Sequence, residues 1–287
     1  MRISASSYSF NKLLVEGTET QLSVIAIAKE LGFDDMEFVD VRAPEGVSKE
    51  EYARELKAEC ERLGMGISSY TFGADLLQET EEAQREEIER VKKQVDIAEI
   101  LGVKVLRHDA TFSSKGMSFE QSLPIVAAAC REITEYAEAK GIKTTVENHG
   151  HFYQDSLRVE RLYEAVNHPN FGLLCDMGNF ICVDEDPTTA VSRVAPYAFY
   201  VHAKDFHLKS GNATDPGEGF YKTRGGNYRR GAILGHGDVP VKCCLSALKM
   251  AGYQGGIAIE FEGMEDNVKA LTIGIANLKR YIAELEM

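Results

Sequence analysis

Long apolar runs, paired cysteine motifs and a leader segment are all missing from this sequence. No apolar run approaches the ~18 residues that a membrane-spanning helix needs, so we expect no membrane association. The six cysteines show no CxxC spacing, and we expect reduced thiols rather than disulfides. The first residues carry no charged segment followed by an apolar one, and together these absences predict a cytoplasmic protein.

Basic residues are also scarce relative to acidic ones. The chain has 32 Lys and Arg against 45 Asp and Glu, which gives a formal net charge of -13. Because nucleic-acid binding depends on neutralising phosphates, this balance argues against DNA or RNA as a partner. Composition is otherwise ordinary, with 44% hydrophobic and 27% charged residues, so the chain can bury a full core.

Short apolar or β-branched runs alternate with segments of helical periodicity along the whole chain. We expect strands near residues 3–7, 36–40, 66–70, 103–108, 142–147, 171–176, 197–205 and 256–260. We expect helices near residues 18–32, 48–64, 81–101, 118–141, 156–166, 186–194, 239–251 and 266–284. Three helix starts carry specific signals: Thr18 with Gln21, Ser48 with Glu51, and Asp186 before a proline.

Eight strands that alternate with eight helices predict parallel pairing through helical crossovers. The count matches a single-domain (β/α)8 TIM barrel that spans residues 1–287, and α/β barrels of roughly 250 residues are common as one domain. An open doubly wound sheet is the competing fold. It is disfavoured because no G-x-G-x-x-G motif follows the first strand.

Polar side chains stand at the ends of the last four expected strands. Glu147 ends one strand, and the following three carry Asp176, His202 and Glu260 at or near their ends. Strand ends share one face of a barrel, so these four side chains can converge. Each alone could be a helix cap or a core residue, but three carboxylates together would repel one another without a cation. We therefore predict a site for one divalent ion, with Mn²⁺, Mg²⁺, Co²⁺, Zn²⁺ and Fe²⁺ all compatible.

Further residues near the expected strand ends are candidates for substrate contact. Arg107 and His108 are strand neighbours and face opposite sides, so only one reaches the barrel mouth. We predict that His108 is the one that contacts substrate, and the alternative is that His108 has a structural role. The loop histidines His149 and His151 are weaker candidates. The expected substrate contacts are His108, His149, Asn179, Lys204, Arg229 and His236.

Residues 209–235 form the one long stretch without clear periodicity. It follows the seventh expected strand, on the face where barrel active sites lie. Loops of this length are usually functional or disordered, so we expect a lid or specificity loop whose glycines let it close. Its basic residues are either solvated or bind an anionic substrate group such as a phosphate. They are Lys209, Lys222, Arg224, Arg229 and Arg230.

The ordered motifs ENHG, CDMGN, VHAKD, LGHGDVP and IEFE resemble those of the xylose isomerase-like barrel superfamily, often called sugar phosphate isomerases/epimerases. The resemblance spans the whole chain. Its members include ketose 3-epimerases, inosose isomerases and dehydratases, and one type of apurinic endonuclease. In the epimerases the matching Glu, Asp, His and Glu bind one divalent ion. Carried across, the resemblance makes Glu147 and Glu260 both ligands and the acid/base pair, with Asp176 and His202 as further ligands.

Several positions depart from the patterns of these relatives. Ketose 3-epimerases have His, Glu and Arg where this chain has Asn179, Tyr153 and Leu208, so a different grip on the sugar is implied. The endonucleases have metal-binding Asp and His where this chain has Arg229 and Gly231. A one-metal site is what the resemblance supports.

The resulting hypothesis is a sugar isomerase or epimerase that abstracts a proton next to the carbonyl of a keto-sugar or inosose through a metal-stabilised enediolate. Loss of a β-hydroxyl from the same intermediate would make it a dehydratase, which is the alternative. A phosphodiesterase like the apurinic endonucleases and a non-catalytic sugar-binding barrel are less favoured. The resemblance also implies a homo-oligomer, a dimer or tetramer.

Overall fold

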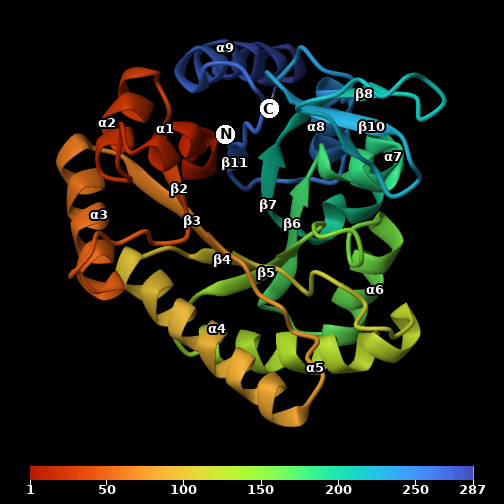
Figure 1. The fold of residues 1–287 in the computed structure, drawn as a ribbon. Helices are drawn as coiled ribbons and strands as arrows, with labels where there is room; N and C mark the ends of the chain where they lie inside the picture. Colours follow the sequence, from red (N-terminus) through yellow and green to blue (C-terminus); the bar gives the residue numbers. More distant parts are fainter. Residues whose placement is uncertain (287) are drawn as a thin grey trace.

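Eight parallel strands close into a barrel in the computed structural model, which describes residues 1–286 (Figure 1). The order around the barrel is β1-β11-β7-β6-β5-β4-β3-β2. These strands are β1 (Ile3–Ser6), β2 (Asp35–Val39), β3 (Gly66–Phe72), β4 (Val105–His108), β5 (Lys143–Glu147), β6 (Phe171–Asp176), β7 (Ala198–Ala203) and β11 (Ile257–Ile259). The predicted TIM barrel is therefore confirmed, and the open doubly wound sheet is wrong.

Helices surround the barrel and cover its outer face (Figure 1). They are α1 (Asn11–Glu16), α2 (Ser23–Glu30), α3 (Lys49–Leu63), α4 (Glu81–Leu101), α5 (Phe119–Glu138), α6 (Ser156–Val166), α7 (Pro187–Val194), α8 (Val241–Met250) and α9 (Asn267–Leu285). The short 3₁₀ helices are η1 (Ser7–Phe10), η2 (Asn179–Val183) and η3 (Ala195–Tyr197).

Two of the three helix-start signals act as expected. Ser48 and Glu51 form a complete capping box on α3, and Asp186 caps α7 with proline in its first turn. The Thr18 signal is wrong, because α2 begins only at Ser23. The Gln21 side chain instead donates to the Asp40 carbonyl and accepts from the Arg42 backbone, so it ties the chain before α2 to the end of β2.

Apolar side chains pack mainly between the strands and the helices, whereas the upper barrel interior is polar. Inward positions alternate along each strand, and the register places Asp176 beside His202 and Leu174 beside Tyr200. Leu174, Tyr200 and Ala258 form a small buried cluster two residues before the ligand positions on their strands. This apolar layer lies beneath the carboxylates at the barrel mouth.

The expected lid is an ordered sheet rather than an irregular loop. The strand predicted at 197–205 ends at Ala203, and β8 (Asp205–Lys209), β9 (Tyr221–Lys222) and β10 (Tyr228–Ala232) form a separate antiparallel sheet. This sheet lies beside the barrel mouth near α7 and α8 (Figure 1). Only glycine fits at position 231, because a Cβ there would lie 2.5 Å from the Glu262 backbone.

All six cysteines are free, in agreement with the sequence-based expectation. Among the described residues, no helix combines the length and the apolar character that crossing a membrane requires.

Candidate metal centre and active site

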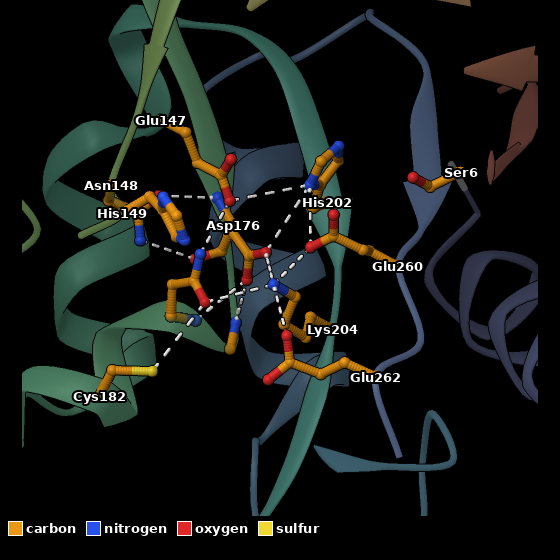
Figure 2. Close-up of polar contacts among 12 residues, drawn as sticks. Ser6, Glu147, Asn148, His149, Asp176, Cys182, His202, Lys204, Glu260 and Glu262 are labelled. Atoms are coloured by element: carbon orange, nitrogen blue, oxygen red, sulfur yellow. Dashed lines mark hydrogen bonds and ion pairs between the residues drawn. The ribbon is translucent and has the colours of Figure 1, made fainter. Parts of the chain in front are cut away.

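The four predicted ligands come together at the carboxyl ends of four neighbouring strands. Glu147 ends β5, Asp176 ends β6, His202 lies in β7, and Glu260 directly follows β11. One donor atom from each lies within 4.8 Å of those of the others, and all four side chains are buried. Figure 2 shows them pointing toward a common point. The convergence expected from strand order alone is therefore present.

The candidate ligand atoms include one that no other group in the described part of the chain binds. His202 Nδ1 lies 3.6 Å from Glu260, 3.7 Å from Asp176 and 3.9 Å from Glu147, yet it has no hydrogen-bond partner among the described residues. Asp176 Oδ2 is also buried and forms an ion pair with Lys204 Nζ at 3.1 Å. Buried polar atoms are rarely left unpaired, so the unpaired His202 Nδ1, surrounded by three carboxylates, fits a divalent ion. Three carboxylates and one imidazole suit Mn²⁺, Mg²⁺ or Zn²⁺.

Backbone and amide groups hold Asp176 with its free oxygen facing inward. Its Oδ1 accepts hydrogen bonds from the backbone N–H groups of Gly178 and Asn179, at 2.8 and 3.0 Å. The Asn148 side chain bonds both the N–H and the C=O of Asp176, at 2.8 and 2.9 Å. Because one carboxylate oxygen and the backbone are already bound, only Oδ2 is available to a ligand.

Cationic side chains neutralise the glutamates in this structure. Arg107 contacts Glu147 directly, and Lys204 contacts Glu260 directly and lies 3.1 Å from Asp176 (Figure 2 shows Lys204 among the acidic groups). Burial opposes ionisation of Glu260, but Lys204 and His202 hold its pKa well below the usual range. Burial raises the pKa of Glu147, and Arg107 opposes that rise. The two candidate acid/base groups therefore differ in proton affinity.

A cavity of about 190 Å³ opens above the ligands. It is lined by Tyr8, Val39, Thr71, Arg107, Glu147, His149, Lys204, Glu260 and Glu262. Most of these residues carry a polar or charged group, and the cationic and anionic groups contact each other. A small polyhydroxy molecule could place oxygen atoms on several of these groups at once.

Three of the expected substrate contacts lie at this site. His149 is half-buried on the cavity wall, and its Nδ1 lies 2.8 Å from Asp109. Burial lowers the pKa of His149, but the Asp109 carboxylate outweighs it and the net shift is upward. Lys204 lies among the carboxylates, and Asn179 donates to Glu147 Oε1 at 2.8 Å. Asn179 therefore orients Glu147.

Two expected contacts lie elsewhere. His108 is fully buried, stacks on Phe72 on the outside of the barrel and bonds the Asp109 carbonyl, whereas its neighbour Arg107 lines the cavity. The choice of His108 over Arg107 was wrong, because the register aligns Arg107 with the inward-facing Thr71. His236 is exposed in the turn after β10 and is not part of the cavity wall.

The three arginines of the expected lid are paired with acidic side chains. Arg229 bonds Glu262 at 3.1 Å, and Glu262 in turn lies 3.5 Å from Lys204. Arg224 bonds Asp155 at 2.9 Å, and Arg230 bonds Glu265 at 3.3 Å. Arg229 thus reaches the site through Glu262, and each of the three arginines has an acidic partner in this structure.

Several residues at the site were not assigned to it from the sequence. Asp109 and Arg107 form a buried ion pair at 2.8 Å behind Glu147, and Glu37 contacts His202 from across the barrel. Each had a visible signal, a charged residue inside or directly after an apolar strand, because such a residue is rarely buried without a partner. Tyr8 and Glu262 also line the cavity. The sequence pattern does not show that their segments lie close to it.

The chain matches the family described as the xylose isomerase-like TIM barrel over residues 25–281, nearly its whole length. The chain belongs to the xylose isomerase-like TIM barrel family. The resemblance drawn from the ordered motifs is therefore confirmed.

Similar proteins and solved structures share less than a quarter of their residues with this chain. L-ribulose-5-phosphate 3-epimerase UlaE of Salmonella heidelberg (strain SL476) is 23% identical over 263 residues, 88% of this chain and 85% of that protein. The crystal structure of IOLI protein with a bound zinc atom superposes with a TM-score of 0.77 at 17% identity, covering 99% of both chains. The probable 3-DHS dehydratase AsbF from Bacillus anthracis gives a TM-score of 0.74 at 17% identity, over 97% of this chain and 99% of that chain. These structures share the fold.

The structure locates two positions at which this chain differs from the ketose 3-epimerase pattern. Tyr153 is fully buried, bonds Ser122 at 2.8 Å and packs on Phe119, away from the cavity. Leu208 lies in β8 and is 41% exposed. Neither residue can replace the Glu and Arg of the ketose 3-epimerase pattern.

Proposed function

We propose that this protein is a divalent-metal-dependent isomerase or epimerase that abstracts a proton next to the carbonyl of a keto-sugar or inosose. One observation carries the proposal: one possible ligand atom from each of four buried side chains lies within 4.8 Å of the others, and His202 Nδ1 has no hydrogen-bond partner within residues 1–286. The epimerase relative supports a sugar substrate. The net charge of -13 argues against a phosphodiesterase that acts on nucleic acid.

Glu147, Asp176, His202 and Glu260 would hold the cation. Bound there, it would supply Lewis-acid polarisation of the substrate carbonyl, a contribution of several kcal/mol. Glu147 and Glu260 would exchange protons with the substrate carbon, since both reach the cavity wall. Arg107 and Asn179 hold the Glu147 carboxylate in place for this exchange.

Lys204 and His149 would bind substrate oxygens at the cavity wall. Lys204 can donate to a hydroxyl or to a developing oxyanion, because its ammonium faces the cavity. His149 is oriented by Asp109, which leaves its second ring nitrogen free for the substrate. General acid/base groups of this kind each contribute about 10²- to 10⁴-fold.

Dehydration of an inosose or keto-sugar is the second candidate function. The His149–Asp109 pair favours it, since it adds a third group able to deliver a proton to a departing β-hydroxyl. The fold shared with a dehydratase is compatible with this chemistry. The two candidates differ in the fate of the hydroxyl, not in the first proton abstraction.

Proton exchange on a substrate panel tests the proposal. The Mn²⁺-loaded protein would be incubated in D₂O with inososes, ketohexoses, 3-keto-glycosides and their phosphates, and deuterium uptake followed by NMR. We expect uptake next to the carbonyl of at least one compound, abolished by EDTA and restored by Mn²⁺. The absence of exchange on the entire panel, or exchange that EDTA leaves unchanged, would contradict it.

A further inference from the structure

Glu37 is a buried carboxylate that the proposed chemistry does not use. It lies in β2, and its side chain crosses the barrel interior to His202 in β7. In the barrel β2 and β7 are separated by β1 and β11, so the contact is not between neighbouring strands. Both side chains are completely buried. A carboxylate in such a place needs a specific partner, and the imidazole is that partner.

We propose that Glu37 is a positioning residue that fixes the tautomer and ring orientation of His202 for metal binding. Both Glu37 oxygens lie within hydrogen-bond distance of His202 Nε2, at 3.0 and 2.8 Å. A carboxylate accepts only, so Nε2 carries the proton that is donated to it. In the neutral imidazole, Nδ1 would then offer its lone pair to a cation held among the three carboxylates that surround it. This inference rests on the proposed metal-dependent function.

The surrounding contacts hold Glu37 itself in one orientation. Ser6 donates its hydroxyl to Glu37 Oε1 at 3.1 Å. Ser6 and Glu37 are paired residues of β1 and β2, so the hydroxyl is fixed by the strand register. The order Ser6, Glu37, His202 forms a chain of hydrogen bonds that ends at the unpartnered Nδ1 atom. Histidine ligands whose second nitrogen bonds a carboxylate are common in metal sites, and losing that carboxylate weakens metal binding 10- to 100-fold.

The competing explanation is a buried ion pair that only stabilises the fold. Such a pair would affect the unfolding free energy, but it would not set the metal affinity of the folded protein. Glu262 provides a control, because it is a glutamate on the cavity wall near Lys204 that makes no contact with His202. Glu37→Gln and Glu262→Gln each remove one negative charge, and only the first removes the carboxylate behind His202.

Isothermal titration with Mn²⁺ at one pH measures the difference. We expect Glu37→Gln to raise the Kd for Mn²⁺ by about 10- to 100-fold. Glu262→Gln should change it by less than about threefold, the modest effect of a partly exposed charge. Thermal unfolding of each metal-free variant would establish that it is folded. Equal Kd values for wild type and Glu37→Gln would overturn the inference while the proposed function stands.

A wild-type measurement covers the case in which Glu37→Gln does not fold. In the Zn²⁺-loaded protein with ¹⁵N-labelled histidine, NMR would show His202 with a proton on Nε2 and none on Nδ1. The signal would be assigned by its loss in His202→Gln. A proton on Nδ1 instead would overturn the inference. If the wild type binds neither ion, the proposed function fails first and the positioning role fails with it.

Discussion

Lys204 contacts the carboxylate of Glu260 inside the acidic cluster at the barrel mouth. Its ammonium group also lies 3.1 Å from Asp176, so one lysine neutralises two of the four side chains proposed to bind a cation. Lysine and metal ion therefore compete for the same negative charge. Metal binding would leave the ammonium free to turn toward Glu262 and the substrate.

Replacing Lys204 should strengthen metal binding while weakening catalysis. Lys204→Met keeps the aliphatic stem and removes the charge, so we expect the Kd for Mn²⁺ to fall by about tenfold, equivalent to about 1.4 kcal/mol. Turnover on any substrate found in the exchange screen should decrease. Calorimetric titration checks the first result, and an unchanged or larger Kd would show that Lys204 does not compete with the ion.

The two glutamates should be separable by isotope exchange. Glu147→Gln and Glu260→Gln should each lower turnover by at least about 10²-fold, because each removes an acid/base group. In one of the two, deuterium exchange at the substrate carbon should persist without product, since the remaining glutamate still abstracts its proton. Measurements need Mn²⁺ concentrations that saturate each variant. Full activity in either variant would remove that residue from the assignment.

His108 should make the stability of the protein depend on pH. Burial lowers its pKa from 6.5 to about 4, so the folded state stays neutral while the unfolded state takes up a proton. The free energy of unfolding therefore falls as the pH drops from 6.5 to 4, by up to about 1.4 kcal/mol per pH unit from this residue. His108→Phe should flatten that slope. Urea unfolding between pH 7 and 4.5 measures it, with His236→Asn, at an exposed histidine, as the control. Identical slopes in wild type and His108→Phe would refute this.

Asp205 should be among the most important residues for stability outside the core. Its buried carboxylate accepts four backbone N–H groups at 2.8 to 3.1 Å, those of Phe206, Gly235, Gly237 and Val239. Asp205→Ala would leave these donors unpaired, and we expect a loss of about 3 to 5 kcal/mol in unfolding free energy.

The neighbouring Asp238 offers a comparison for this prediction. It is exposed, and its carboxylate accepts a hydrogen bond from the Leu208 backbone N–H at 2.7 Å, so Asp238→Ala should cost about 1 kcal/mol or less. Urea unfolding of both variants gives the two values. A cost for Asp205→Ala no larger than that for Asp238→Ala would show that the four N–H groups find other partners.

Local patterns were sufficient for the barrel and for the convergence of the four candidate ligands. The barrel follows from the alternation of strand and helix periodicities, and the convergence follows because strand ends must share one face of the barrel. The choice between Arg107 and His108 could not be made in this way. The two-residue period says that only one faces inward, but which one depends on the register with β3.

Long-range pairing explains most of what the sequence did not reveal. The contact between Glu37 and His202 joins residues 165 positions apart, and no local signal connects them. The strands β9 and β10 were missed because β9 has only two residues and β10 is rich in basic and small ones. Both are stabilised by pairing with β8, which a single-sequence pattern does not show.

Metal content after dialysis tests the central claim most directly, because the account requires that Glu147, Asp176, His202 and Glu260 bind one divalent cation. Wild-type protein and Asp176→Ala would be dialysed against Mn²⁺, freed of excess ion and analysed by mass spectrometry for the metal. We predict about one Mn²⁺ per wild-type chain and a stoichiometry near zero for the folded variant. Wild-type protein without metal, or the same metal content in both proteins, would contradict the account.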